Sequence, residues 1–132
     1  MPEWLDASDG IYFHQMLINE HGGLHGIRNE GALESTLARP IHLLKYEPET
    51  AIHELAASCG FGLLKNHVFN DGNKRISLAV IDIFLRINGM QLDAEEVDAV
   101  CVIKDVASDA MNEADLANWI EVNSIPFDLG AK

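Results

Sequence analysis

The side chains best suited to chemistry stand close together in residues 67–75 of this chain. The segment reads His-Val-Phe-Asn-Asp-Gly-Asn-Lys-Arg, so an imidazole, a carboxylate, a glycine, an amide and two cations are close neighbours. A histidine such as His67 can act as a general base near neutral pH. A carboxylate such as Asp71 can bind Mg²⁺, which takes one or two carboxylates together with phosphate oxygens. The adjacent cations Lys74 and Arg75 can bind a phosphate group.

An apolar helix is expected to begin where this segment ends. From Ile76 to Ile87 apolar residues recur at helical spacing, and only Ser77, Asp82 and Arg86 interrupt the run. A helix that is apolar on nearly every face is a buried one. The first N–H groups of a helix lack intrahelical partners, and the helix dipole is positive there. A polar loop at this position therefore predicts an anion site.

Each of these side chains also has a purely structural explanation. His67 could cap a helix end, and Asp71 could be the N-cap of the helix that follows. The pair Asp71-Gly72 is also a hairpin signal, but the flanking segments follow helical spacing, which favours a loop before a helix. Lys74 and Arg75 would stand at a helix N-terminus, where the dipole disfavours cations. Two cations in that position indicate an anionic partner.

A glycine and an amide complete the candidate phosphate site. Gly72 would let a ligand approach the backbone closely, and Asn73 could offer a backbone N–H group. No Walker A loop, protein-kinase signature or dinucleotide fingerprint occurs in the chain. The other histidines are expected to be structural, since no two of them pair with a carboxylate at metal-site spacing: His14, His21, His25, His42 and His53.

The length of 132 residues predicts a single domain, residues 1–132, and the composition is that of an ordinary globular protein. The net charge of -12 argues against a general nucleic-acid binder, which would need a basic face. Three of the nine basic residues, Lys65, Lys74 and Arg75, nevertheless cluster around the predicted anion site. This placement predicts a local cationic site on an acidic protein.

Cysteine use and hydropathy predict a cytoplasmic location. Cys59 and Cys101 both lie in apolar helical contexts and outside any metal-binding spacing, so we expect reduced thiols in the core. The chain starts without a basic and apolar signal segment, and its longest apolar run is too short to span a bilayer. We therefore expect no membrane partner.

The rest of the chain predicts an all-α fold, a compact bundle around the buried central helix. Gly22 and Gly23 end a first helix and begin residues 22–29, which we expect to form a flap or a small hairpin. Asn29 is the expected N-cap of a short helix, with Pro40 beyond its end. The expected helices cover approximately residues 7–21, 30–38, 49–65, 76–88, 94–107 (after the cap residue Asp93) and 113–123.

Residues 67–75 resemble the signature of the Fic/Doc superfamily, HxFx(D/E)(A/G)N followed by (K/G)R. The similarity is close to the death-on-curing branch, the toxins of bacterial toxin–antitoxin pairs. The Gly-Gly-Leu sequence at 22–24 and the Phe-Leu-Arg-Ile-Asn-Gly sequence at 84–89 agree with the same family. The resemblance is clear over about residues 17–89, and it implies a Fic/Doc-like helical bundle.

One position in the signature separates two activities. Adenylyl-transferring Fic enzymes carry Gly-Asn-Gly-Arg, whereas this chain has Lys74 at the second glycine position, as death-on-curing toxins do. In that branch the altered loop is understood to turn the nucleotide so that its γ-phosphate faces the acceptor. The resemblance therefore implies Mg²⁺- and ATP-dependent phosphorylation of a serine or threonine hydroxyl on a protein. The implied target class is elongation factor Tu, and the implied outcome is arrest of translation.

Two alternative functions stay open. Gly72 stands where death-on-curing toxins typically carry alanine and matches the Fic pattern, which favours adenylyl transfer to a protein hydroxyl. The second alternative is a module that has lost catalysis and only binds an antitoxin.

The resemblance also implies a role for each site residue. His67 would deprotonate the acceptor hydroxyl, and Asp71 would bind Mg²⁺. Residues 22–29 would align the target peptide. The inhibitory (S/T)xxxE(G/N) string of many Fic proteins is absent, so we expect restraint from a separate antitoxin chain whose partly disordered tail folds into a groove on the toxin. The phosphates of ATP would be held by Gly72, Asn73, Lys74 and Arg75.

Overall fold

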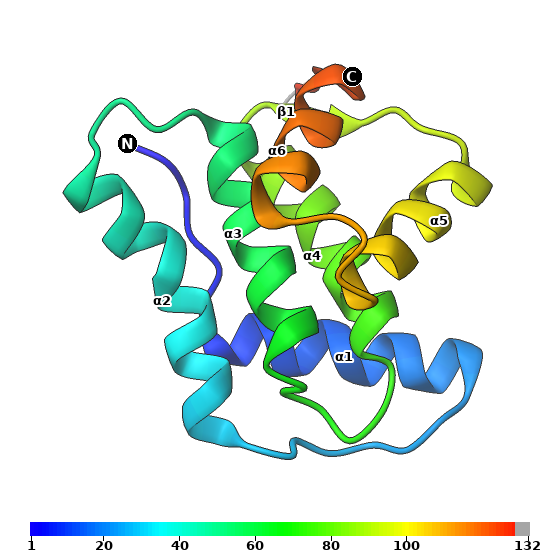
Figure 1. Ribbon diagram of the computed structural model, residues 1–132. Coiled ribbons are helices and arrows are strands. Elements are labelled where there is room, and N and C mark those ends of the chain that lie inside the picture. Colours follow the sequence, from blue (N-terminus) through cyan, green and yellow to red (C-terminus); the bar gives the residue numbers. More distant parts are fainter. Residues whose placement is uncertain (129–132) are drawn as a thin grey trace.

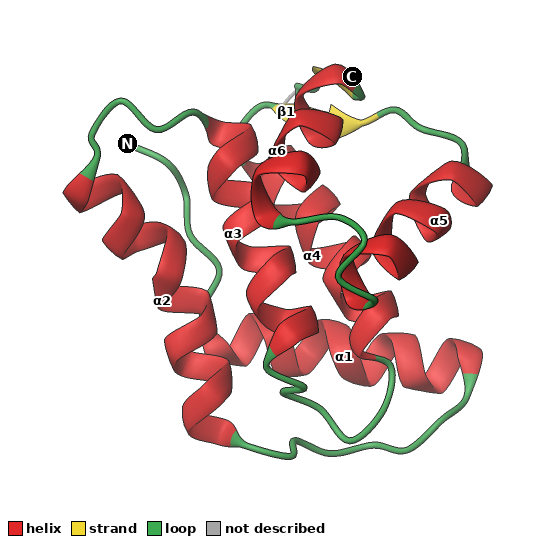
Figure 2. Ribbon diagram, viewed as in Figure 1, coloured by secondary structure: helices red, strands yellow, loops and turns green. Residues whose placement is uncertain are grey.

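The computed structural model describes residues 1–128, which form six helices and one small sheet (Figures 1 and 2). The all-α bundle expected from the sequence is confirmed. The helices are α1 (Ala7–His21), α2 (Glu30–Tyr46), α3 (Ile52–Lys65), α4 (Asn73–Ile87), α5 (Glu96–Ala107) and α6 (Glu113–Val122). The strands are β1 (Met90–Leu92) and β2 (Ser124–Pro126).

Helices α3 and α4 lie side by side at the centre of the bundle (Figure 1). Helices α2 and α6 pack on α3, α5 packs on α4, and α1 crosses the lower ends of the central pair. The two central helices approach closely at Gly60, where an added Cβ would stand 2.5 Å from the Ile81 side chain. The Ser77 hydroxyl donates to the Gly60 carbonyl at 2.7 Å, so this polar interruption of α4 is satisfied in the core.

The prediction that α4 is the buried central helix is confirmed. Ile76, Val80, Ile81, Phe84 and Leu85 on this helix are all fully buried. Burying an aliphatic or aromatic side chain of this size contributes about 1.5–3 kcal/mol. The helix that follows residues 67–72 is therefore held rigidly, and it gives the loop before it a fixed base.

Helix α2 is longer than expected, because Pro40 does not end it. The helix continues through Pro40 to Tyr46, so the predicted end at Ala38 is wrong. A proline inside a helix costs about 3 kcal/mol, and tertiary contacts offset that cost here. Pro40 is buried, and the neighbouring Arg39 donates to the Ser58 carbonyl on α3 and pairs with Glu113 of α6 at 2.8 Å.

Two helix starts are also later than expected. Helix α3 begins at Ile52 rather than at residue 49, because a turn in which Thr50 N–H donates to the Glu47 carbonyl precedes it. Helix α5 begins at Glu96 rather than directly after Asp93. The Asp93 N–H donates to the Asn123 carbonyl at 2.6 Å, which continues the strand pairing past β1.

The small sheet was not expected from the sequence. Strand β1 pairs with β2 in antiparallel register, with Gln91 opposite Ile125. The two strands are three residues long and far apart in the chain, so neither carries an alternating pattern. Residues 22–29 form no hairpin of their own; their one ladder contact is an antiparallel bridge between Ile27 and Phe69.

One of the two cysteine predictions is wrong. Cys59 is buried, and that burial raises the pKa of its thiol to about 12. Cys101 is exposed, because the inward face of α5 is formed by other residues: Ala99, Val102, Ile103 and Val106. Both thiols are free.

Within residues 1–128, the helices all lack the combined length and apolarity that a membrane span requires.

Candidate active site

The loop between α3 and α4 carries the candidate site at the lower end of the bundle (Figure 1). Val68 and Phe69 are buried and anchor this loop in the core, whereas His67 between them and α3 is exposed. His67 has a φ of +45°, the left-handed conformation that commonly ends a helix and that usually belongs to glycine. The loop thus turns sharply at His67 and presents its imidazole at the surface.

Asn73 holds the other end of the loop. Its side-chain Oδ1 accepts from the Phe69 N–H at 3.0 Å, and its Nδ2 donates to the Phe69 carbonyl at 2.9 Å. Both polar groups of the side chain are therefore committed to the loop. What Asn73 can offer to an anion is its backbone N–H, one of the first in α4 without an intrahelical acceptor.

Asp71 does not cap α4, so the expectation that this carboxylate could be the N-cap is wrong. The N-cap is Gly72, with a left-handed φ of +75° and no side-chain cap bond. The Asp71 carboxylate accepts from the N–H of Leu24 at 3.1 Å and from the N–H of Gly72 at 2.8 Å. These two backbone bonds, with the positive charge of Arg75, hold the pKa of Asp71 below its usual range. An ionised carboxylate is what a hard cation requires.

Residues 22–29 lie against this loop and are held by its backbone. The Arg28 N–H donates to the Val68 carbonyl at 2.8 Å, and the Asn70 N–H donates to the Gly26 carbonyl at 3.1 Å. At Gly23, with φ +118°, an added Cβ would stand 2.7 Å from the Asp71 carboxylate. We call residues 22–29 the flap. Its backbone packs on the loop, and a glycine is required where it meets Asp71.

Sequence reasoning missed one residue of the site, His14 on α1. It was expected to be structural, and it is indeed only 2% exposed. Its ring, however, stacks on Phe69 at 3.8 Å between centroids, and its Nε2 lies 2.7 Å from the Asp71 carbonyl oxygen. The available signal was its place one helical turn before Ile18, on the buried face of α1 that begins at Gly10.

The cations around the loop are not equivalent. Lys65 pairs with Asp109 and also lies over the Phe61 ring, so its charge is already neutralised. Lys74 and Arg75 are exposed and form no salt bridge with the described residues 1–128. The predicted cationic cluster is therefore reduced to these two side chains in the first turn of α4.

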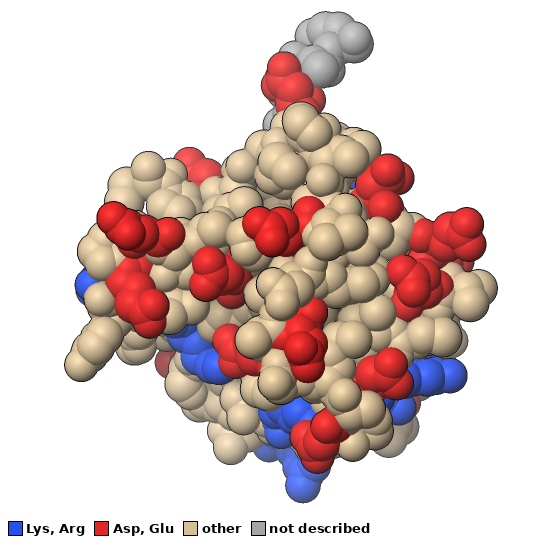
Figure 3. Space-filling model, turned by 45° about the horizontal axis from the view of Figure 1, so that its top comes forward, with Lys and Arg blue, Asp and Glu red and all other residues tan. Residues whose placement is uncertain are grey.

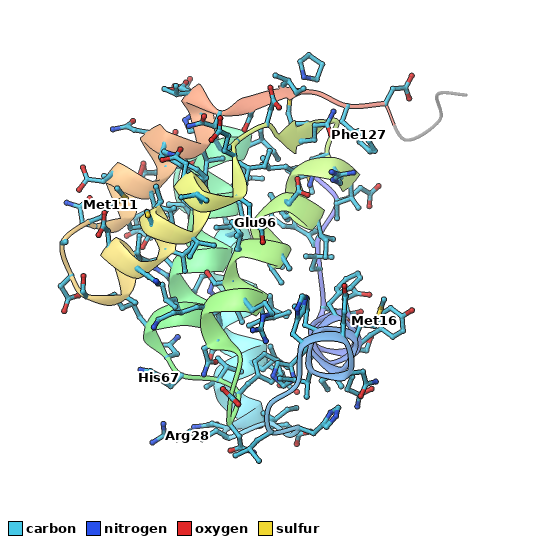
Figure 4. The ribbon with its side chains drawn as sticks, turned by 90° about the vertical axis from the view of Figure 1, so that its right-hand side faces the viewer. Met16, Arg28, His67, Glu96, Met111 and Phe127 are labelled. Atoms are coloured by element: carbon cyan, nitrogen blue, oxygen red, sulfur yellow. The ribbon has the colours of Figure 1, made fainter. Side chains whose placement is uncertain are left out.

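One open groove of about 910 Å³ gathers the predicted site residues. All six of them line it: His67, Asp71, Gly72, Asn73, Lys74 and Arg75. The flap does not line it, although Figure 4 shows Arg28 at the same end of the molecule as His67, away from Met16. From this polar end the groove continues along an apolar flank on α4, β1 and α5 that includes Leu78, Leu92 and Ile103. Its volume suits a ligand of nucleotide size.

A metal ion at this site would depend on a ligand for most of its coordination. Among residues 1–128, no group of three histidine, cysteine, aspartate or glutamate side chains could hold a metal ion. Mg²⁺ is commonly held by one or two carboxylates, with water and phosphate oxygens completing its shell. The single ionised carboxylate of Asp71 fits an ion of that kind, shared with a bound phosphate.

Comparison with known proteins identifies the family that this fold and loop define. Residues 4–85, from the start of the chain through α1, the flap, the loop and nearly all of α4, match the model of the Fic/DOC family. The chain therefore belongs to the Fic/Doc family.

Two relatives place the chain in the death-on-curing branch of that family. It is 35% identical over 82 residues to "Protein kinase doc" of Escherichia phage P1, a match that covers 62% of this chain and 65% of the phage protein. It is 34% identical over 115 residues to "Toxin Doc" of Mycolicibacterium smegmatis, a match that covers 86% of this chain and 81% of that protein. Both regions of similarity are long enough to hold the complete loop.

Proposed function

We propose that this protein is the toxin of a toxin–antitoxin pair and transfers the γ-phosphoryl group of ATP to a serine or threonine hydroxyl of a target protein. The observation that carries the proposal is the position of Lys74. It lies in the first turn of α4 without a salt bridge to any of residues 1–128, in the same groove as His67 and Asp71. It stands at the second glycine position of the Fic pattern Gly-Asn-Gly-Arg, where death-on-curing toxins also carry lysine. The names of the two relatives, a protein kinase and a toxin, support the same activity.

His67 is the proposed general base. Its imidazole is exposed in the groove and makes no hydrogen bond within residues 1–128, so it is available to an incoming hydroxyl. The acceptor proton would pass to the imidazole while the acceptor oxygen bonds to the γ-phosphorus. The bond from that phosphorus to the bridging oxygen breaks, and ADP leaves. A positioned base contributes about 10²–10⁴-fold to such a step.

Lys74, Arg75 and the first N–H groups of α4 are the proposed phosphate ligands. Phosphoryl transfer depends mainly on positioning and on neutralising the charge of the phosphate oxygens. Two cations that form no salt bridge within the described part of the chain, at the positive end of a helix dipole, suit that task. Gly72, which has no side chain, leaves the backbone open beside them. Asp71 would hold Mg²⁺, which, when bound, neutralises phosphate charge.

The proposed partners follow from the family and from the surface. The target proposed is elongation factor Tu in the cytoplasm, with arrest of translation as the result. The proposed regulator is a separate antitoxin, whose tail would occupy the groove along its apolar flank near Leu78 and Ile103. On the face in Figure 3 acidic side chains are scattered from top to bottom, and the fewer basic ones lie mainly in the lower half. Such a surface supports partners other than nucleic acid.

Transfer from two labelled forms of ATP tests the activity. The protein is mixed with elongation factor Tu and Mg²⁺, once with label on the γ-phosphate and once with label on the α-phosphate. We expect label to move only from the γ position and not at all with His67→Ala. Label moving from the α position would establish adenylyl transfer instead. Absence of transfer from both, with cell lysate also tried as acceptor, would leave an antitoxin-binding module.

A Lys74→Gly variant tests the residue on which the proposal rests. It restores the Gly-Asn-Gly-Arg sequence of adenylyl-transferring enzymes. We expect it to lose γ-phosphoryl transfer, because a groove cation and the family-specific loop are both changed. The control is Lys74→Arg, which keeps the positive charge at the same position. A glycine substitution of another lysine, such as Lys45→Gly, would not serve as a control, because Lys45 lies inside α2. Unchanged γ-phosphoryl transfer by Lys74→Gly would contradict the role given to Lys74.

A further inference from the structure

We propose that His14 is a positioning residue that sets the orientation of the Asp71 carboxylate through a single peptide plane. His14 lies on α1, outside the family signature, and it does not line the groove that holds the six predicted site residues. The inference rests on the proposed function only where it states what the oriented carboxylate does, which is to help bind a metal–nucleotide complex. The hydrogen-bonded chain that carries it is independent of that function.

The first link is the bond between His14 and the backbone of Asp71. The imidazole is 2% exposed, and its Nε2 lies 2.7 Å from the Asp71 carbonyl oxygen. A carbonyl oxygen only accepts, so Nε2 must carry the proton. The ring is held in place by stacking on Phe69, with 3.8 Å between centroids and 7° between planes. His14 is therefore a fixed donor aimed at one carbonyl group.

The second link is the peptide unit between Asp71 and Gly72. The Asp71 carbonyl and the Gly72 N–H belong to one rigid plane. A donor that fixes the carbonyl therefore also fixes the direction of the N–H. That N–H donates to Oδ1 of Asp71 at 2.8 Å, while the Leu24 N–H of the flap donates to Oδ2 at 3.1 Å. The carboxylate is clamped between the flap and a peptide that His14 holds.

The third link is the support that α1 gives to this peptide. Ile18, one helical turn after His14, is 3% exposed. Its Cδ1 would lie 3.2 Å from a Cβ built on Gly72 and equally 3.2 Å from one built on Gly23. The same face of α1 thus supports the loop and the flap where they meet Asp71. A peptide supported in this way has one orientation, and His14 supplies the hydrogen bond that selects it.

Two substitutions of His14 distinguish the proposed positioning role from a purely structural role of its ring. His14→Phe keeps an aromatic ring to stack on Phe69 but removes the donor. His14→Gln loses the stacking but carries an amide N–H at nearly the distance of Nε2 from the backbone. His53→Phe is the matched control, because it replaces a partly buried histidine elsewhere in the bundle, on α3, whose Nε2 lies 3.7 Å from a carboxylate oxygen of Glu121 on α6.

The decisive measurement is the affinity of the wild type and the three variants for Mn²⁺ in the presence of ADP. The paramagnetic signal of the ion reports its binding. Residues that orient a metal ligand typically affect metal affinity by about 10–100-fold. We expect a loss of that order for His14→Phe, recovery toward wild type for His14→Gln, and no loss for His53→Phe. Wild-type affinity in His14→Phe would overturn the proposal, as would an equal loss in His14→Gln.

A second readout keeps this inference separate from the proposed function. Should the wild type itself not bind Mn²⁺ with ADP, the proposed metal role of Asp71 fails. The positioning role is then decided by amide hydrogen exchange at Gly72 and Leu24. Exchange at both is expected to be faster in His14→Phe than in His53→Phe. Equal exchange rates in these two variants, or a histidine ring found protonated on Nδ1 alone by ¹⁵N NMR, would overturn the proposal.

Discussion

The side-chain amide of Asn73 binds both backbone polar groups of Phe69, four residues before it. These two bonds close the loop that carries the candidate site. We predict that Asn73→Ala destabilises the protein by about 1–3 kcal/mol, because it leaves a partly buried donor and acceptor without partners. Urea denaturation measures this change. Asn70→Ala is the control, since Asn70 is exposed and its side chain makes one hydrogen bond within residues 1–128, a long one of 3.3 Å to the His25 carbonyl.

The left-handed backbone conformation of His67 should lower the stability of the protein. A residue other than glycine in the left-handed conformation is strained, and His67 has φ +45°. We predict that His67→Gly gains up to about 1 kcal/mol of unfolding free energy relative to His67→Ala, whereas both variants lack transfer activity. Thermal denaturation tests the predicted difference in stability, and the labelled-ATP assay tests the predicted loss of activity. Equal stability of the two variants would show that the turn is not strained.

The packing of the flap against Asp71 should require a glycine at position 23 more strictly than at position 22. Both residues have positive φ, so an alanine at either position is strained by its backbone. At Gly23 the added Cβ would meet Asp71, at 2.7 Å, whereas at Gly22 no atom of another described residue, its two chain neighbours apart, would lie within 4 Å of it. We predict that Gly23→Ala increases amide exchange at Leu24 much more than Gly22→Ala does. Similar exchange in both variants would contradict the close approach of flap and carboxylate.

Asp71 should contribute to stability in a pH window set by its lowered pKa. Its folded-state pKa lies below 3.8, the ordinary value, because the N–H groups of Leu24 and Gly72 favour the ionised form. The contribution is therefore fully present above the ordinary value and is lost as pH falls through the folded-state pKa. We predict that Asp71→Asn lowers stability at pH 6 and that the difference from wild type shrinks below about pH 4. Urea denaturation across that range measures it, and a constant difference would contradict the bonds described.

Much of the site could be predicted because its signals are local. Nine consecutive residues carry the predicted side chains, and the apolar run from Ile76 onward predicts the buried helix that fixes them. All six predicted site residues line one groove for that reason. His14 could not be predicted as part of the site, because its partner lies 57 residues away and a histidine on a buried face usually has a structural role.

The misplaced elements have the same cause. Pro40 is a local signal for a helix end, but its burial and the contacts of Arg39 with α3 and α6 outweigh that signal. The start of α5 depends on a bond from Asp93 to Asn123, which no local pattern encodes. Cys101 was placed in the core because its neighbours are apolar, yet a helix turns it to the outer face.

The Asp71 carboxylate is held by partners that lie far from it in the chain. Leu24 is 47 residues away and His14 is 57 residues away. Neither contact can form until α1, the flap, α3 and the loop before α4 have all been synthesised and have folded together. A nascent or partly unfolded chain thus contains the whole signature but not the ordered site. For a toxin of the proposed kind, a chain in which α1 and the flap have not yet met the loop would carry the signature without the ordered carboxylate.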